Sequence, residues 1–489
     1  MNFSVIRYVV GTVLKIEGLL FLLPAAVGLI YGEKQFLSFL ICAAAAVVLG
    51  FAVSVKKPGN QVFYAREGFI AVALSWIVLS LCGCVPFVIN GDIPNFVDAF
   101  FETVSGFTTT GSSVLPDVEA LSKCSLFWRS FTHWIGGMGV LVFILSVIPM
   151  TGGAAMNLMK AESPGPNVGK IVPKLRETSM ILYVIYSVLT VAEIIILLIG
   201  GMPLFDAITL SFGTAGTGGF GIKNTSIADY SVFCQYTIGI FMILFGINFN
   251  TYYLLLARRF KQALKGEEVR WYLIIIAAAT ALITVNTLKM FGTAEEAFRN
   301  AFFQVGSIMT TTGYSTFNFD IYPEISKNIL VLLMFIGACA GSTGGGIKVS
   351  RIIILIKSVR NELQRMIHPR TVKKIRLEKK VIEHETQRST DTFLVAYILI
   401  FIASFFLISV DNFDFTTNFT AVVATINNIG PGLNKVGPMN NFGEFSDLSK
   451  IVFSFDMLAG RLEVFPMIVL FSPKTWTGSI KKIRRINID

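Results

Sequence analysis

Ten apolar runs, most of them close to the length that a helix needs to cross a bilayer, constrain the fold of this chain more than any other feature. A spanning helix needs about 20 apolar residues. Only 15% of the 489 residues are charged, against roughly 25% in soluble proteins. So few charges cannot cover so much apolar surface, which excludes a soluble enzyme, a nucleic-acid-binding protein and a secreted disulfide-rich domain. The runs cover roughly residues 5–31, 36–55, 68–90, 124–150, 178–200, 230–257, 271–291, 327–357, 392–410 and 448–472.

The connections between the runs alternate in charge, which predicts how the chain is oriented in the membrane. One set is basic and includes Lys56, Lys57, the linker 358–390 and the tail 481–485. The other set is more acidic. Cytoplasmic loops carry an excess of lysine and arginine, so we expect both termini in the cytoplasm. The net charge of +10 is concentrated in these loops, and we expect membrane lipid rather than nucleic acid as a partner.

Two roles remain open for the linker 358–390, the only sizeable polar stretch. Its basic cluster includes Lys373, Lys374 and Arg376. The linker is either an amphipathic helix at an anionic lipid leaflet or a docking surface for a cytosolic partner.

A fourfold repeat runs through the outer connections. Each contains an apolar segment too short to span, followed by a strip that contains glycine, at a spacing near 100 residues. The short segments are 96–107, 204–213, 297–309 and 415–426, and the strips are 108–112, 215–219, 310–314 and 427–431. We therefore expect an all-α polytopic membrane protein with four repeats of helix, pore half-helix and helix, as in potassium channels, plus an N-terminal helical hairpin. The expected units are 1–57 for the hairpin and 58–160, 161–265, 266–390 and 391–489 for the pore repeats.

The composition of the strips favours a monovalent cation. Irregular backbone at membrane depth is tolerated where it is buried in protein or lines a water-filled cavity. Backbone carbonyls in such a strip can replace the hydration shell of an ion, and the C-terminal ends of the half-helices add partial negative charge. The strips contain neither basic nor acidic side chains, which argues against anions and divalent cations. The alternative is that the strips are ordinary re-entrant packing loops.

Two further features lie inside predicted spans. Five glycines in residues 337–346 cannot hold a helix, because each costs about 1 kcal/mol in a helix interior, so this stretch is either a flexible loop across the pore or a site of close helix packing. Arg461 lies in the last span, where a charge usually faces the protein interior or a cavity. We consider a pore charge and a structural ion pair with Glu463 or Asp456. No role is evident for Glu193, and we expect His133 to be a packed interfacial histidine.

The stretch 131–139, the four strips and the stretch 460–466 together resemble the TrkH/KtrB superfamily of potassium transporters. The hairpin 1–57 is more similar to the TrkH branch than to the shorter KtrB branch. The resemblance implies potassium uptake across the bacterial inner membrane, no catalytic residues and no cofactor bound by this chain. It also implies a homodimer with one pore per subunit and a cytosolic, nucleotide-binding, TrkA-like regulatory subunit. A sodium-coupled potassium symporter of the KtrB type is the alternative function.

The resemblance also assigns site residues, with Gly111, Gly218, Gly313 and Gly430 as the glycines of the filter. One departure is Gly216, which stands beside the second strip's Gly218 and Gly219 and could loosen that side. The implied potassium filter is Thr109, Thr110, Gly111, Gly216, Thr217, Gly218, Thr311, Thr312, Gly313, Asn428, Ile429 and Gly430. The implied gate loop includes Gly337, Gly341, Gly344, Gly345, Gly346 and Lys348, with Arg461 as the pore charge.

Overall fold

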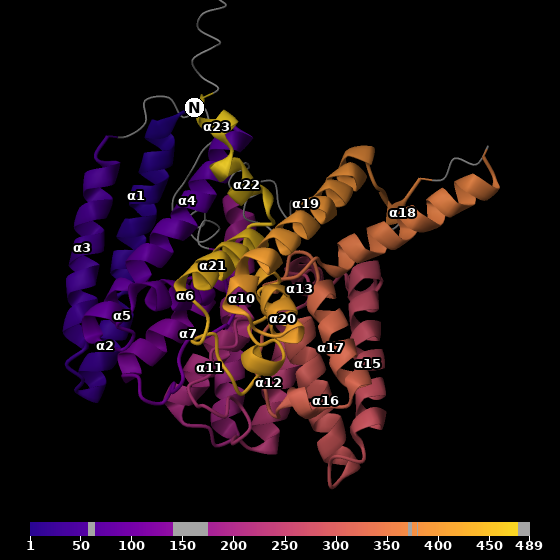
Figure 1. The fold of residues 1–489 in the computed structure, drawn as a ribbon, viewed down its shortest axis with the longest axis horizontal. Coiled ribbons are helices and arrows are strands. Elements are labelled where there is room, and N and C mark those ends of the chain that lie inside the picture. The colour runs from indigo at the N-terminus through magenta and orange to yellow at the C-terminus, as the bar shows by residue number, and fades with distance from the viewer. Residues whose placement is uncertain (57–63, 140–174, 370–373, 379, 478–489) are drawn as a thin grey trace, which may run out of the picture.

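A computed structural model describes residues 1–56, 64–139, 175–369, 374–378 and 380–477, and this part of the chain is a bundle of helices (Figure 1). The expected all-α membrane fold is confirmed. The N-terminal hairpin and the first unit contain α1 (Phe3–Leu20), α2 (Leu22–Tyr31), α3 (Phe36–Ser54), α4 (Ala65–Gly83), α5 (Val85–Asn90), α6 (Phe96–Phe107) and α7 (Lys123–Met138). The second unit contains α10 (Leu175–Ile199), α11 (Leu204–Gly216), α12 (Val232–Phe245), α13 (Phe249–Leu256) and α14 (Phe260–Leu264).

The C-terminal half of the chain contains the helices of the expected third and fourth units, and the expected boundary between residues 390 and 391 falls inside one helix, His384–Ile408. The third contains α15 (Glu267–Thr287), α16 (Ala294–Met309), η1 (Phe319–Ile321), α17 (Glu324–Ile336), α18 (Val349–Ile367) and the antiparallel strands β1 (Arg376–Leu377) and β2 (Lys380–Val381). The fourth contains α19 (His384–Ile408), η2 (Ser409–Asp411), α20 (Phe415–Ile426), η3 (Asn434–Val436), α21 (Asp447–Arg461), α22 (Phe465–Phe471) and α23 (Pro473–Thr477). Figure 1 shows α1 and α3 on one side of the bundle and α18 projecting from the other.

Within the residues that the structure describes, there are fewer continuous spans than the ten that the sequence predicts. Six described helical segments are long and apolar enough to cross a membrane, and α12 with α13 forms a further candidate that bends by 91°. The run 124–150 is described only as far as Gly139. The runs 5–31 and 68–90 each contain two helices that together make one candidate span. The runs 230–257, 327–357 and 448–472 are also divided into two helices, and none of these three forms one of the six continuous spans.

Local chemistry explains where these runs divide. The side chain of Asn248 starts α13 by accepting a hydrogen bond from the N–H of Asn250 at 2.9 Å. Gly337 ends α17 with a left-handed φ of 73°. After α21, Glu463 and Val464 have positive φ angles of 55° and 70°. Positive φ is rare for a β-branched residue such as Val464. Only the break at Gly337 was predicted, because its glycines are visible in the sequence.

The half-helices α6, α11, α16 and α20 have 12, 13, 16 and 12 residues. At a rise of about 1.5 Å per residue, none is long enough to cross the hydrocarbon core. Side-chain oxygens of Asn95, Thr293 and Asp414 accept hydrogen bonds from the first turns of α6, α16 and α20. Three of the four half-helices therefore begin at ends capped by a side chain, whereas α11 follows Pro203 without such a cap. The C-terminal residues of all four are buried.

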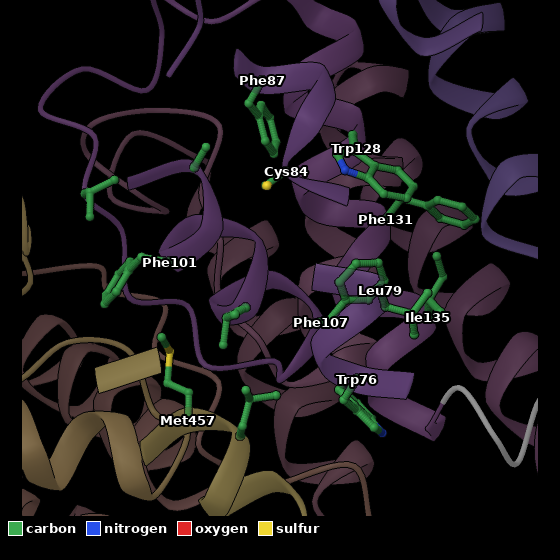
Figure 2. Close-up of a cluster of buried hydrophobic side chains, with 14 of the residues drawn as sticks. Trp76, Leu79, Cys84, Phe87, Phe101, Phe107, Trp128, Phe131, Ile135 and Met457 are labelled. Atoms are coloured by element: carbon green, nitrogen blue, oxygen red, sulfur yellow. The ribbon is translucent and has the colours of Figure 1, made fainter. Parts of the chain in front are cut away.

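Aromatic packing around Trp128 joins the N-terminal hairpin to the first half-helix. The Trp128 ring lies 4.6 Å from the Phe21 ring and 5.9 Å from the Phe107 ring, measured between centroids. Its indole N–H donates to the carbonyl of Gly83 at 3.0 Å. Figure 2 shows Trp76 in the same cluster of buried side chains. The hairpin is thus packed against the helices that position the first strip.

Close packing of α1 on α3 generates a prediction about stability. A β-carbon added to Gly50 would lie 2.7 Å from the carbonyl oxygen of Gly11 and from Cγ of Lys15. The substitution Gly50→Leu should lower the apparent melting temperature in detergent, because overpacking a tight contact costs about 1–3 kcal/mol. Ala45→Leu adds a similar volume at an exposed position of α3 and serves as the control. Equal melting temperatures for the two variants would contradict the prediction.

Candidate functional site

All four half-helices end in the same backbone motif. The residues Thr109, Thr217, Thr311 and Asn428 have left-handed φ angles of 55°, 55°, 60° and 55°. In each case, the N–H of the following residue donates to a carbonyl five positions earlier, at 2.8–2.9 Å. This pattern of a left-handed residue and a 6→1 bond is the Schellman motif. Left-handed threonine is uncommon, so its recurrence marks a backbone that its surroundings hold in place.

The motif sets the register of the strips and corrects the second one. Two residues after each left-handed residue stands a glycine with positive φ, which is 81°, 77°, 87° and 101° in the four strips. These glycines are Gly111, Gly219, Gly313 and Gly430. Gly219 therefore occupies the position that the sequence analysis assigns to Gly218. Three glycines within four residues left the register open, and backbone hydrogen bonds decide it.

The four strips close into a ring in chain order. A β-carbon added to Gly111 would lie 2.0 Å from the carbonyl oxygen of Gly218 in the second strip. A β-carbon added to Gly219 would lie 1.9 Å from the carbonyl oxygen of Thr312 in the third strip. Each strip glycine thus abuts a carbonyl of the next strip.

The last two contacts complete the ring. A β-carbon on Gly313 would lie 2.2 Å from the oxygen of Ile429, and one on Gly430 would lie 2.9 Å from the oxygen of Thr110. Four equivalent carbonyls are therefore packed against four equivalent glycines. Any side chain at these glycines would displace a carbonyl, which explains the residue type.

A cavity of about 230 Å³ lies at this ring, and all four strip glycines are in its wall. Most side chains of the strips are buried. Two threonine pairs hold strips one and three from behind: Thr108 and Thr110 are joined by a 2.8 Å hydrogen bond, and Thr310 and Thr312 by one of 2.7 Å. The backbone of the strips thus faces the cavity, and the hydroxyls stabilise the backbone.

A buried ion pair that the sequence analysis missed supports the first two strips. Arg129 Nη2 lies 2.6 Å from Glu102 Oε1, and both side chains are buried. Glu102 also accepts from the N–H of Val114 at 3.0 Å, and the Arg129 guanidinium lies 4.0 Å from the centre of the Phe220 ring. This pair could have been suspected from the sequence, because an arginine and a glutamate inside apolar segments usually pair with each other or serve a function.

The outer loops of the first two units are also joined by polar contacts. Asn224 Nδ2 donates to Asp117 at 2.8 Å, and this bond lowers the pKa of the carboxyl group. The N–H of Asn224 donates to Glu119 at 3.0 Å. These contacts hold together two loops that line the cavity.

The glycine-rich loop 337–348 contacts the inner ends of the third and fourth half-helices. Gly345 N–H donates to Thr311 Oγ1 at 2.6 Å, and Gly346 N–H donates to the carbonyl of Asn427 at 3.1 Å. A β-carbon on Gly345 would lie 2.3 Å from that same carbonyl oxygen. Gly337, Gly341 and Gly346 have left-handed φ angles of 73°, 72° and 77°. The loop is therefore built from glycine where it approaches the half-helix ends most closely.

Two cationic side chains bind the carbonyls of this loop. Lys348 Nζ donates to the carbonyl of Gly344. Arg461 Nη1 donates to the carbonyl of Thr343 at 2.8 Å, and its Nη2 donates to the carbonyl of Gly137 at 2.7 Å and to that of Gly136. Arg461 thus connects the loop to α7.

The acids considered as partners for Arg461 have other contacts. Glu463 forms an ion pair with Arg351, and Asp456 accepts a hydrogen bond from Ser404 Oγ at 2.6 Å. Glu193 is fully buried on α10, the helix that precedes the second half-helix.

His133 lies at the site rather than at an interface with solvent. It is fully buried, and its ring contacts the first half-helix and the second strip. Its expected role as a packed interfacial residue is therefore corrected. The sequence offered no sign of this contact beyond the polar residue in an apolar helix.

Comparison with known proteins identifies the family of the chain. A family model, TrkH, described as a cation transport protein, matches residues 32–481. The Trk system potassium uptake protein TrkH of Salmonella typhimurium is 36% identical over 97% of this chain and 100% of that protein. The Trk system potassium uptake protein TrkG of Escherichia coli is 34% identical over the same shares. The crystal structure of the potassium transporter TrkH from Vibrio parahaemolyticus superposes with a TM-score of 0.87 at 33% identity, covering 97% of this chain and 100% of that one. The chain therefore belongs to the TrkH family of cation transport proteins.

Proposed function

We propose that this chain takes up potassium ions across the bacterial inner membrane through a channel-like pore, with a filter of backbone carbonyls and a gate made by the loop 337–348. The observation that carries the proposal is the ring in which four carbonyls pack against four glycines, with those four glycines in the wall of one cavity. The relatives' names support potassium as the substrate. The chain is a membrane transporter and not an enzyme.

The chemistry of the ring suits a monovalent cation. The proposed ligands are neutral carbonyl oxygens from Thr110, Gly218, Thr312 and Ile429 and from the left-handed residues before them. Neutral oxygens can replace the water around a potassium ion without binding it as tightly as carboxylates would. Four half-helix C-termini point into the bundle, and their partial negative charges favour a cation there.

The proposed gate works by releasing a small number of bonds. In the described state, the loop is held by Gly345 and Gly346 on the half-helix side. Arg461 and Lys348 hold its carbonyls from the other side. The segment 344–346 consists of glycine alone, which is conformationally free, so this segment can move while Cys339 and Ala340 keep the first part of the loop bonded to Gly246 and Glu268. The positive charges of Arg461 and Lys348 also keep a cation in the pore from binding too tightly.

The proposed assembly is a homodimer with a cytosolic, TrkA-like regulatory subunit. Helix α18 follows the gate loop directly and projects from the bundle (Figure 1). Its side chains Ile356, Leu363 and Met366 are 63%, 55% and 70% exposed, so the helix presents an apolar stripe to a partner. A partner that moves α18 would pull on the loop.

We also propose that both termini lie in the cytoplasm. The excess of lysine and arginine in one set of connecting loops supports this orientation.

The ring generates a prediction about selectivity. Gly313→Ser should lower the potassium-over-sodium flux ratio about tenfold, equivalent to about 1.4 kcal/mol of lost discrimination. The cause is that a side chain at Gly313 displaces the Ile429 carbonyl, which lies 2.2 Å from the added β-carbon. Rubidium and sodium fluxes into liposomes measure the ratio. Gly221→Ser is the matched control, because Gly221 lines the same cavity and its nearest neighbour would be 3.3 Å away.

One result would count against the proposed filter, and another would count against channel-like uptake. One is an unchanged ratio in a Gly313→Ser protein that is folded and monodisperse. The other is potassium uptake by the unmodified protein that requires sodium, which would favour the sodium-coupled symporter.

The loop generates a second prediction. Deleting residues 342–345 should raise passive rubidium flux, because the segment held against Thr311 and Asn427 is removed. Gly345→Ala should raise flux to a smaller degree, since its β-carbon would push the loop from the Asn427 carbonyl, only 2.3 Å away. If both variants conduct no more than the unmodified protein, the stretch is a packing element and the gate lies elsewhere.

Arg461 generates a third prediction, with two variants that separate charge from hydrogen bonding. Arg461→Ala should bind potassium more tightly and leak more, because it loses both the positive charge and the tie to Thr343. Arg461→Lys should leak but keep its affinity, because lysine keeps the charge without the planar fork. Isothermal titration and rubidium flux are the measurements. A loss of folded protein in Arg461→Ala that is rescued by neutralising an acid would assign Arg461 a structural role.

A further inference from the structure

The second strip lacks the threonine pair that supports two of the others. In the register set by the Schellman motifs, Gly216 corresponds to Thr108 and Thr310, and Gly218 corresponds to Thr110 and Thr312. The second strip therefore has no side chain at either position, although its Gly218 carbonyl belongs to the ring. Some other group must support it from behind, because an unsupported strip would not hold a fixed carbonyl position.

The imidazole of His133 occupies the space that a side chain at Gly218 would fill. A β-carbon added to Gly218 would lie 2.3 Å from both Cγ and Nδ1 of His133. The His133 ring also packs on the ring of Phe220, the residue that follows the second strip, with centroids 4.3 Å apart. The ring is fully buried, so it takes the place of the missing threonines by direct contact.

Both ring nitrogens are used to join neighbouring units. Nδ1 lies 2.7 Å from the carbonyl oxygen of Gly106, to which it donates, and Nε2 accepts from the N–H of Phe220 at 3.2 Å. The Gly106 carbonyl also accepts the N–H of the left-handed Thr109 at 3.1 Å. A neutral imidazole with its hydrogen on Nδ1 satisfies these partners. His133 therefore connects the end of the first half-helix to the strip that follows Gly218.

Glycines on α7 allow this approach. A β-carbon on Gly136 would lie 1.8 Å from the Phe107 carbonyl oxygen, and one on Gly137 would lie 2.6 Å from Cα of Gly216. Helix α7 is thus inserted between the ends of the first two half-helices, with His133 at the contact.

We propose that His133 is a positioning residue that determines ion selectivity, by holding the Gly218 carbonyl of the second strip in the ring. This inference rests on the proposed function of the ring as a potassium filter. It predicts a specific coupling between His133 and Gly218 that neighbouring Gly216 does not share. The reason is that a β-carbon on Gly216 would meet the backbone oxygen of His133, at 2.2 Å, and not its ring.

The test is a pair of double-mutant cycles on the potassium-over-sodium flux ratio in liposomes. His133→Ala alone should lower the ratio, and Gly218→Ala should lower it about tenfold. Adding His133→Ala to Gly218→Ala should restore part of the ratio, because the added β-carbon then fills space that the ring leaves, and contacting residues show couplings of this size. In the matched cycle, His133→Ala should not restore the ratio of Gly216→Ala. Absence of rescue at Gly218, or equal rescue at both glycines, would overturn the proposal.

A second comparison covers the case in which a glycine variant does not fold. His133→Gln retains one donor and one acceptor, whereas His133→Ala retains neither. We expect His133→Gln to keep the higher flux ratio when the two proteins have equal melting temperatures, and equal ratios would overturn the proposal. If the unmodified protein does not discriminate potassium from sodium, the proposed filter fails. If it discriminates but the cycle shows no coupling, only the role of His133 fails.

Discussion

The need to satisfy backbone polar groups inside the membrane governs this structure. Four half-helices end at membrane depth, where an unpaired N–H or C=O costs several kcal/mol. Each end resolves the problem with a left-handed residue whose neighbour bonds back to the helix. The chain then leaves as an extended strip, with its side chains buried in protein and its glycines in the cavity wall. The ring of carbonyls is thus a consequence of how four helices are terminated.

The four strips share a backbone but differ in what supports them. Threonine pairs support the first and third strips, and the His133 ring supports the second. In the fourth strip, Asn427 Nδ2 donates a hydrogen bond of 2.9 Å to the hydroxyl of Tyr397 on α19. Of the four half-helix ends, the glycine-rich loop 337–348 binds those of the third and fourth, and Arg461 links that loop to α7, which carries His133. The proposed filter and the proposed gate therefore share supporting residues, and a change at one is expected to reach the other.

Sequence patterns revealed much of this architecture, and the exceptions have identifiable causes. Run lengths and charge marked the helices, and glycine beside threonine marked the strips. The division of 230–257 and 448–472 was not predicted, because their breaks depend on a cap by Asn248 and on positive φ at Val464. The Gly218 register was missed because glycine permits several backbone conformations equally well, and tertiary hydrogen bonds selected one.

By itself, the sequence determined that this chain is a helical membrane protein with four short half-helices, because hydrophobic run length and strip composition are local properties. Only the tertiary structure decided the order in which the strips close, the partners of Arg461 and the contact of His133 with Gly218. Those features depend on distances between residues that lie 85 to more than 300 positions apart in the chain. No local pattern encodes such distances, since they follow from how close the glycines of α7 and of the strips allow the backbones to approach.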